Sequence, residues 1–308
     1  MMDETKVIKR KKKIDWGKTI FLIVILAVPI SNFLVFWLGT NFSSILMAFQ
    51  YNEGKLVFWG FRNYVNIWKD ITSDGAILSA FVNTMYFFLT NLVITLPISL
   101  LLCYFLFKKI KGYKFFRFVF YLPSLLPATA LVMIFRYIIS TAGLYGEFMD
   151  LINQEAISLL KSPNTAMPTI LFYQIMFSFG GNIILLSGAM NHIDSSILEA
   201  AKIDGCDMVT EIFRIVIPLI WPTLSTLIVF AFVGMLGSSG PILLFFEDLA
   251  QTEGYRVNTL SFWIYKSVYY TGEYYYASSV GLIMTAIGLP ISLGIRKLLG
   301  KTMEAVEM

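Results

Sequence analysis

The sequence predicts an all-α, polytopic membrane protein with six transmembrane helices and both termini on the cytoplasmic side. Apolar residues make up 57% of the 308 residues and charged residues only 14%, with a mean hydropathy of +0.70. A soluble domain carries about 25% charged residues, so much of this surface faces something other than water. Lipid offers no partner for backbone N–H and C=O groups, and each crossing must therefore be helical.

Six segments approach the length of about 20 apolar residues that crosses a bilayer. They are roughly Thr19–Leu38, Phe81–Phe107, Phe116–Ser140, Pro168–Ala189, Pro218–Ser238 and Ala277–Gly294. The predicted organisation is a basic N-terminus at 1–18, a transmembrane domain at 19–298 and a C-terminal tail at 299–308.

The distribution of Lys and Arg sets the orientation. With a cytoplasmic N-terminus, seventeen of the 24 basic residues fall in cytoplasmic segments and six in the outer loops. Arg136 lies near the outer end of the third segment. Positive charge accumulates on the cytoplasmic side of membrane proteins, so this orientation is favoured over the inverted one.

The basic N-terminal stretch precedes an apolar run that is longer than the core of a cleavable signal peptide, and no clear cleavage site follows it. We therefore expect an uncleaved first helix, and the lysine run is typical of a topology determinant or a lipid contact rather than a nucleic-acid site. Cys103 and Cys206 both fall on the reducing side, so we expect no disulfide.

The outer segment between the first two helices, residues 50–80, holds several Trp and Tyr residues that favour the membrane interface. The longest outer loop, residues 240–276, is rich in Tyr, which favours interfacial anchoring or docking of a partner. In the last helix, Pro290 should kink or break the helix.

The stretch Ser195–Pro222 between the fourth and fifth helices is the most informative part of the sequence. Ser196 and Glu199 have the spacing of a capping box, which predicts a short helix beginning there. Gly205 should end that helix and Asp207 should cap a second one that leads to the membrane at Pro218. A short helix held at a membrane surface suits docking into a groove on another protein.

The residues of this stretch resemble the EAA signature of permeases in ATP-binding-cassette importers. Glu199-Ala200-Ala201, then Gly205 and then Ile215-x-Ile217-Pro218 match its spacing. The consensus has Leu where Ile217 stands, often Ala where Cys206 stands, and Ile-Pro where Ile193-Asp194 stands. We refer to residues 191–217 as the 191–217 loop; its candidate docking residues are Ser196, Glu199, Ala200, Ala201, Asp204, Gly205, Ile215 and Pro218.

Further motifs resemble the carbohydrate branch of this family. Gly60-Phe61-Arg62-Asn63-Tyr64 and Asn83-Thr84 are similar to elements at the start of its second helix, and Phe116-Arg117 through Leu122-Pro123 to its third. The resemblance covers residues 60 to 298. It implies the type I permease fold in the bacterial cytoplasmic membrane and an oligosaccharide or polyol-rich cargo moved by alternating access.

The resemblance also implies the partners: a second homologous permease, two cytoplasmic ATPases and an extracytoplasmic solute-binding protein. ATP and Mg would be bound by the ATPases, and this chain would hold no cofactor or metal. The implied sugar-pathway positions, together with one polar residue in the fourth helix, are Phe177, Ser178, Gly181, Asn182, Gly234 and Ser238. Glycine and serine at these positions can equally serve close helix packing.

Two enzyme motifs fail on geometry or spacing. Gly237-Ser238-Ser239-Gly240 resembles the rhomboid-protease motif, but His192 is the chain's one histidine and is expected at the opposite membrane face. Gly17-Lys18-Thr19 lacks the glycine that a phosphate-binding loop requires. We expect no enzyme activity. The alternative that stays open is a secondary transporter or channel without an ATPase, although such proteins often carry ionisable residues within their spans.

Overall fold

The computed structural model describes residues 16–54, 56–73, 75–237, 239–246 and 251–304. Among these residues, four helices are long and apolar enough to cross a membrane: Trp16–Met47, Ala76–Phe107, Ala166–Met190 and Tyr274–Lys301. Two bent helix pairs, each counted as one crossing, bring the number to six. The structure is therefore that of a mostly helical, polytopic membrane protein with four to six crossings.

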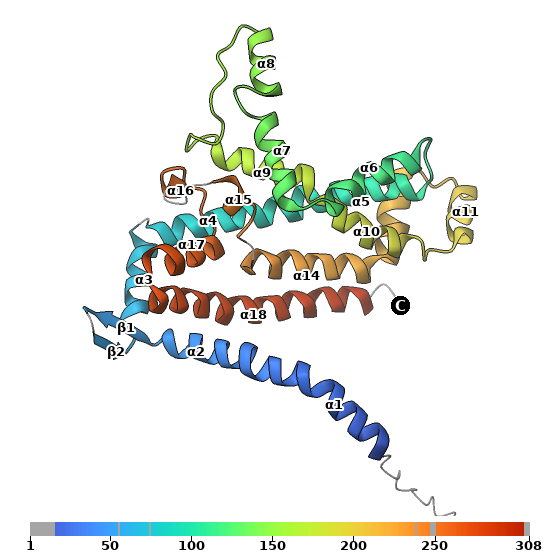
Figure 1. The fold of residues 1–308 in the computed structure, drawn as a ribbon. Helices are drawn as coiled ribbons and strands as arrows, with labels where there is room; N and C mark the ends of the chain where they lie inside the picture. The colour runs from blue at the N-terminus through green and yellow to red at the C-terminus, as the bar shows by residue number, and fades with distance from the viewer. Residues whose placement is uncertain (1–15, 55, 74, 238, 247–250, 305–308) are drawn as a thin grey trace, which may run out of the picture.

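The first crossing is one long helix composed of α1 (Trp16–Asn32), the π-helical segment η1 (Phe33–Leu38) and α2 (Gly39–Met47). None of the residues whose burial is described in α1 and η1 is buried. Only α2 packs extensively on the rest of the chain, against the last helix α18 (Tyr274–Glu304), and α1 diverges from the bundle (Figure 1). Lipid or another subunit must cover this apolar surface, because water would not.

A small hairpin follows the first crossing and departs from the all-α prediction. It pairs β1 (Gln50–Glu53) with β2 (Leu56–Trp59) in antiparallel register, with Gln50 opposite Trp59. All four residues of β2 are exposed. The helix α3 (Arg62–Thr72) then leads towards the second crossing. A surface-lying segment was predicted here, but no strands. The pairing of the two strands depends on contacts that the Trp and Tyr content does not reveal.

The second crossing consists of α4 (Ala76–Leu89), the π-helical segment η2 (Thr90–Thr95) and α5 (Leu96–Phe107). The third predicted crossing is not one continuous helix. It divides into α6 (Tyr113–Leu125) and α7 (Ala128–Ile138), which meet at 106°. Leu126 is extended, with φ −90° and ψ 146°, because Pro127 disfavours the helical conformation of the residue before it and donates no hydrogen bond.

After α8 (Leu144–Leu151), the fourth crossing combines α9 (Ala166–Phe177) with α10 (Phe179–Met190). The chain then forms α11 (Ser195–Ile203), followed by a second helical stretch of three consecutive elements: α12 (Met208–Glu211), the π-helical segment η3 (Ile212–Val216) and α13 (Ile217–Leu219). A 79° bend separates this stretch from α14 (Trp221–Gly237). The fifth predicted crossing, which was placed at Pro218, therefore starts its membrane-length helix three residues later.

The C-terminal third contains α15 (Ile242–Phe245), α16 (Gln251–Gly254), α17 (Leu260–Lys266), the π-helical segment η4 (Ser267–Thr271) and α18. Pro290 lies inside α18, and this helix of 31 residues runs through it, so the break that was one of the two expected outcomes is absent. A proline removes one intrahelical hydrogen bond, which transmembrane helices tolerate when neighbouring groups or local adjustments compensate.

Three apolar clusters hold these helices together. One joins α7, α9 and α15, and another joins α3, α4, α17 and α18. The third combines α5, α10, η3 and α14. The third cluster lies where the 191–217 loop leaves the bundle, at the end that carries α11, whereas the hairpin lies at the other end (Figure 1).

Candidate functional site

The 191–217 loop presents α11 as a largely exposed helix at one end of the molecule. None of its nine residues is buried. A helix this short is marginal in water because nucleation costs more than a few hydrogen bonds return. It is therefore held by its capped ends and by Leu198, which is half-buried against the third apolar cluster.

The N-terminus of α11 is capped by Asp194, not by Ser196 as the capping-box spacing predicted. The Asp194 carboxylate accepts a hydrogen bond from the Ser196 backbone N–H at 3.0 Å, and Ser196 lies within the first turn. This bond lowers the pKa of the Asp194 carboxyl below its ordinary 3.8. Asp and Ser are both good caps, so the choice between neighbouring candidates rests on backbone conformation.

Gly205 ends α11, as predicted. Its φ of +76° is left-handed, a conformation that glycine adopts without strain. The Gly205 N–H donates to the Lys202 carbonyl at 3.2 Å, and the Cys206 N–H donates to the Ala201 carbonyl at 2.9 Å. These two bonds form a Schellman motif, which satisfies the last carbonyls of the helix.

The second helical stretch starts at the predicted cap. The Asp207 carboxylate accepts from the Thr210 N–H at 3.3 Å, and its contacts with Thr210 lower its pKa. The stretch then enters the bundle, where Ile212 and Val216 are fully packed against α5 and α10. Ile215 and Pro218 are half-buried beside them. The second half of the signature is thus an anchor, and the first half is an exposed surface.

A partly buried ion pair, which was not predicted from the sequence, ties this anchor to the second crossing. The Lys108 ammonium lies 2.6 Å from the Glu211 carboxylate, whose side chain is only 8% exposed. The Lys108 ammonium also lies 5.7 Å from the Tyr104 ring centroid. The sequence held a signal for this pair. Glu211 is an acidic residue that leads into an apolar run, and the segment after the second helix is rich in lysine.

The surface of α11 combines small, charged and apolar side chains. Ser196, Glu199 and Ala200 are exposed, Asp204 forms the exposed C-cap, and Ala201 is half-buried. Ile203 projects with 86% of its surface exposed. The small residues leave the backbone of the helix accessible, so a partner groove can approach it closely.

A second candidate site is a cavity of about 330 Å³ between η2, α9 and α14, which we call the midspan cavity. Two predicted pathway residues, Ser178 and Gly234, line it. A Cβ added at Gly234 would meet no atom within 4 Å, so this glycine leaves open space rather than allowing a close helix contact. The volume lies in the usual range of small-ligand sites, about 300–1,000 Å³.

Three other predicted pathway residues do not line this cavity. Phe177 packs against Tyr173 and Phe135, with ring centroids 4.8 Å and 6.1 Å away. Gly181 is exposed and Asn182 half-buried, and both lie outside the lining. Ser238 lies outside the described residues.

The polar lining of the midspan cavity was not predicted from the sequence. Asn91 and Gln174 both face it from within apolar spans. The Gln174 Nε2 atom donates to the Phe87 carbonyl at 3.2 Å, whereas its Oε1 atom is buried without a hydrogen-bond partner among the described residues. The cost of placing polar residues in a membrane span, which singled out Asn182, was a signal for these two as well.

Comparison with known proteins assigns the family. The model for the binding-protein-dependent transport system inner membrane component matches residues 95–304. The chain belongs to this family. The matched region includes the 191–217 loop and two of the elements that line the midspan cavity, α9 and α14, whereas the cavity wall formed by Phe87, Phe88 and Asn91 precedes it.

Relatives along most of the chain come from several bacteria. The multiple sugar-binding transport system permease protein MsmF of Streptococcus mutans is 27% identical over 88% of this chain and 91% of its own length. The arabinooligosaccharides transport system permease protein AraP of Bacillus subtilis is 24% identical, over 87% and 85%. The lactose transport system permease protein LacF of Rhizobium radiobacter is 27% identical, over 81% and 84%.

Solved structures show the same fold. A chain of a bacterial ABC transporter involved in the import of the acidic polysaccharide alginate superposes with a TM-score of 0.81 at 20% identity, over 93% of this chain and 97% of that chain. A chain of the alginate transporter in complex with alginate pentasaccharide-bound periplasmic protein gives 0.80. This chain therefore has the fold of an ABC importer permease.

Proposed function

We propose that this chain is the permease subunit of an ATP-binding-cassette importer that moves an oligosaccharide or related polyol into the cell. The observation that carries the proposal is α11: an exposed helix, capped at both ends and anchored to the bundle through η3, within a chain of this family. A rigid helix on a buried anchor can transmit force from a docked partner to the transmembrane helices.

The cargo class rests on relatives and on the midspan cavity. The relatives are named for sugars, arabinooligosaccharides and lactose. The cavity combines aromatic faces from Phe87, Phe88 and Tyr173 with the carboxamides of Asn91 and Gln174. A sugar offers apolar C–H faces for the rings and hydroxyls for the amides, and a hydroxyl could donate to the unpartnered Gln174 Oε1 atom.

The proposed mechanism is alternating access between two packings of the helices. Two cytoplasmic ATPases bind and hydrolyse ATP with Mg, and each receives the α11 helix of one permease. Since ATP binding favours one packing over the other, it opens the cavity to one side at a time. A second permease would face this one, and the uncovered α1 supports that pairing because it leaves the bundle with its apolar surface bare.

The location proposed is the bacterial cytoplasmic membrane, with both termini and the 191–217 loop in the cytoplasm. The bias of Lys and Arg supports this orientation. The hairpin then faces outward, where a solute-binding protein would deliver the cargo. The periplasmic protein in the related alginate complex supports that partner.

Purification of the tagged chain from native membranes tests the proposal. Wild type should bring a second permease and an ATPase, whereas Gly205→Tyr should lose the ATPase because the left-handed backbone and the docking surface are both disturbed. Gly54→Tyr is the matched control: Gly54 also has a positive φ and open space around it, but lies in the hairpin. Wild type that purifies without any ATPase would favour a secondary carrier or channel instead.

A further inference from the structure

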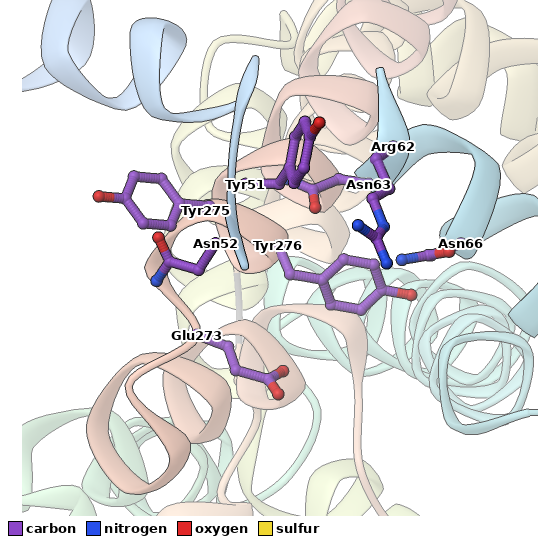
Figure 2. Close-up of a pocket in the computed structure, with 8 residues that line it drawn as sticks. All are labelled: Tyr51, Asn52, Arg62, Asn63, Asn66, Glu273, Tyr275 and Tyr276. Carbon is purple, nitrogen blue, oxygen red and sulfur yellow. The ribbon is translucent and has the colours of Figure 1, made fainter. Parts of the chain in front are cut away.

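A second cavity, of about 450 Å³, is lined by residues at the hairpin end of the molecule (Figure 2). That end lies far from α11 (Figure 1). We call it the hairpin cavity. Its lining comes from β1, α3 and the start of α18, and it shares no residue with the midspan cavity. Its volume is also within the range of small-ligand sites, about 300–1,000 Å³.

Buried hydrogen bonds hold the walls of the hairpin cavity in place. The Asn63 Nδ2 atom donates to the Gln50 carbonyl at 2.7 Å and to the Ser279 Oγ atom at 3.1 Å. Ser279 Oγ in turn donates to the Ala48 carbonyl at 2.8 Å. Asn63 is 6% exposed and Ser279 is fully buried. Three segments distant in sequence are thus joined, so a ligand would meet a preformed site and avoid much of the ordering cost.

The charged groups in and beside this cavity are one cation and two carboxylates. Arg62 forms an ion pair with Glu53, and its guanidinium carbon lies 5.5 Å from the centroid of the Tyr51 ring. Glu273 adds a carboxylate on the opposite wall (Figure 2). With one cation facing two carboxylates, the cavity does not favour an anion. An ammonium ligand is not favoured either, because the Arg62 cation repels it. The N–H groups of the carboxamides are also donors and cannot accept a hydrogen bond from an ammonium.

The remaining lining groups match a sugar. Asn52 and Asn66 are exposed, and within the described part of the chain their side chains have no hydrogen-bond partner. A carboxamide both donates and accepts, as vicinal hydroxyls require. Tyr275 and Tyr276 add ring faces and hydroxyls, and the Tyr276 hydroxyl is on the same side of the cavity as Arg62 and Asn66 (Figure 2).

We propose that the hairpin cavity binds one unit of a neutral saccharide, as a subsite separate from the transmembrane pathway. This rests on the proposed function, which supplies both the saccharide cargo and the outward orientation of the hairpin. Asn66 and the Tyr276 hydroxyl hold sugar hydroxyls, and the tyrosine rings cover a C–H face. The subsite retains the end of an oligosaccharide at the outer surface before it enters the bundle.

Saturation-transfer NMR on the full chain, purified with its co-purifying partners, tests the subsite with trisaccharides of glucose, galactose and xylose as probes. Asn66→Ala and Tyr276→Phe should each weaken binding of the responding trisaccharide roughly tenfold, about 1.4 kcal/mol. Neither change removes packing: Asn66 is exposed, and the Tyr276 ring, which packs edge-on to Trp263, is kept. Tyr274→Phe, at an exposed tyrosine outside the lining, is the matched control and should bind as wild type.

Gln174→Leu separates this subsite from the midspan cavity and should leave the hairpin-cavity signal intact. Undiminished binding in Asn66→Ala and Tyr276→Phe would overturn the proposal, as would displacement of the sugar by choline. If no probe binds although the complex imports one of them into proteoliposomes, the subsite is wrong and the proposed function stands. Loss of the proposed function itself would appear separately, as failure to co-purify an ATPase.

Discussion

At the residue scale, the 191–217 loop depends on a few side chains that hold helix ends. Asp194 and Asp207 each satisfy an N–H at the start of a helix, and Gly205 turns the chain between the two helices. Each acts locally through the backbone. The consequence is that α11 keeps its shape without burying a single residue.

Gly205→Ala should destabilise the turn by about 1–2 kcal/mol, the cost of the left-handed conformation for a residue with a Cβ atom. Steric contact adds nothing, because a Cβ at Gly205 would meet no atom within 4 Å. Gly205→Asn should cost less, since asparagine tolerates this conformation. ATPase rates of the reconstituted complex should fall in the order wild type, Asn, Ala. Equal loss in Ala and Asn would mean that the left-handed backbone is not the reason for glycine.

The two capping carboxylates should make the loop sensitive to acid. Hydrogen bonds to backbone and side-chain groups lower the pKa of both Asp194 and Asp207 from 3.8. Their contribution is therefore fully present above pH 3.8 and is lost as the pH falls through the lowered folded-state pKa values. Hydrogen exchange of the 208–212 amides, corrected for intrinsic rate, should be constant from pH 7 to 5 and rise below 3.8. Asp207→Asn keeps an acceptor oxygen without the titration and should remove that rise.

At the element scale, the junction between the end of α5 and the start of η3 connects the exposed loop to the bundle. The apolar anchor of Ile212 and Val216 fixes the position of this junction. The Lys108–Glu211 pair lies at its edge, with Lys108 36% exposed and Glu211 nearly buried. Because the two partners differ in solvent access, their loss should have unequal consequences.

Lys108→Met should destabilise the chain more than Glu211→Gln. The first leaves a buried carboxylate without its cation, and we expect a cost of about 2 kcal/mol, between the values for surface pairs and buried pairs. The second leaves a lysine that can still reach water, at a cost of roughly 1 kcal/mol or less. Thermal midpoints in detergent measure both, and the double variant should recover part of the Lys108→Met loss. If Glu211→Gln destabilised the chain more than Lys108→Met, burial of the Glu211 carboxylate would not be what sets the cost of breaking the pair.

At the scale of the whole molecule, the hairpin and α11 occupy opposite ends of the helical bundle (Figure 1). The two cavities are distributed along it: the midspan cavity lies between η2, α9 and α14, and the hairpin cavity opens at the end that carries the strands. Under the proposed function, the end with α11 would receive the ATPases and the end with the hairpin would receive the solute-binding protein.

Thiol labelling should show this polarity. Cys206 is half-buried in the loop and Cys103 is fully buried, so a membrane-impermeant maleimide should label wild type at Cys206. Labelling should occur in inside-out vesicles and not in intact spheroplasts. Asn66→Cys in a Cys206→Ser background should give the opposite pattern. Labelling of both positions from the same side would contradict the orientation derived from Lys and Arg.

Several features of the fold were predictable because they depend on neighbours in the sequence. Apolar runs identify membrane-spanning segments, and glycine and aspartate in the 191–217 loop predict where helices end and begin. The spacing of Glu199, Gly205 and Pro218 identified the family that the comparison assigns. The break in the third crossing is also a local effect, caused by Pro127. It was not predicted because that crossing was identified from its hydropathy, without the effect of proline on the backbone of the preceding residue.

Contacts between distant segments were decided only by the tertiary structure. Lys108 meets Glu211 across 103 positions of the sequence, Asn63 meets Ser279 across 216, and the midspan cavity joins α9 to α14. The sequence by itself determined that the chain is a helical membrane protein and where its loop turns, because backbone sterics and lipid solvation act segment by segment. Which polar groups share a cavity follows from helix packing, and that depends on side-chain shapes summed over the whole bundle.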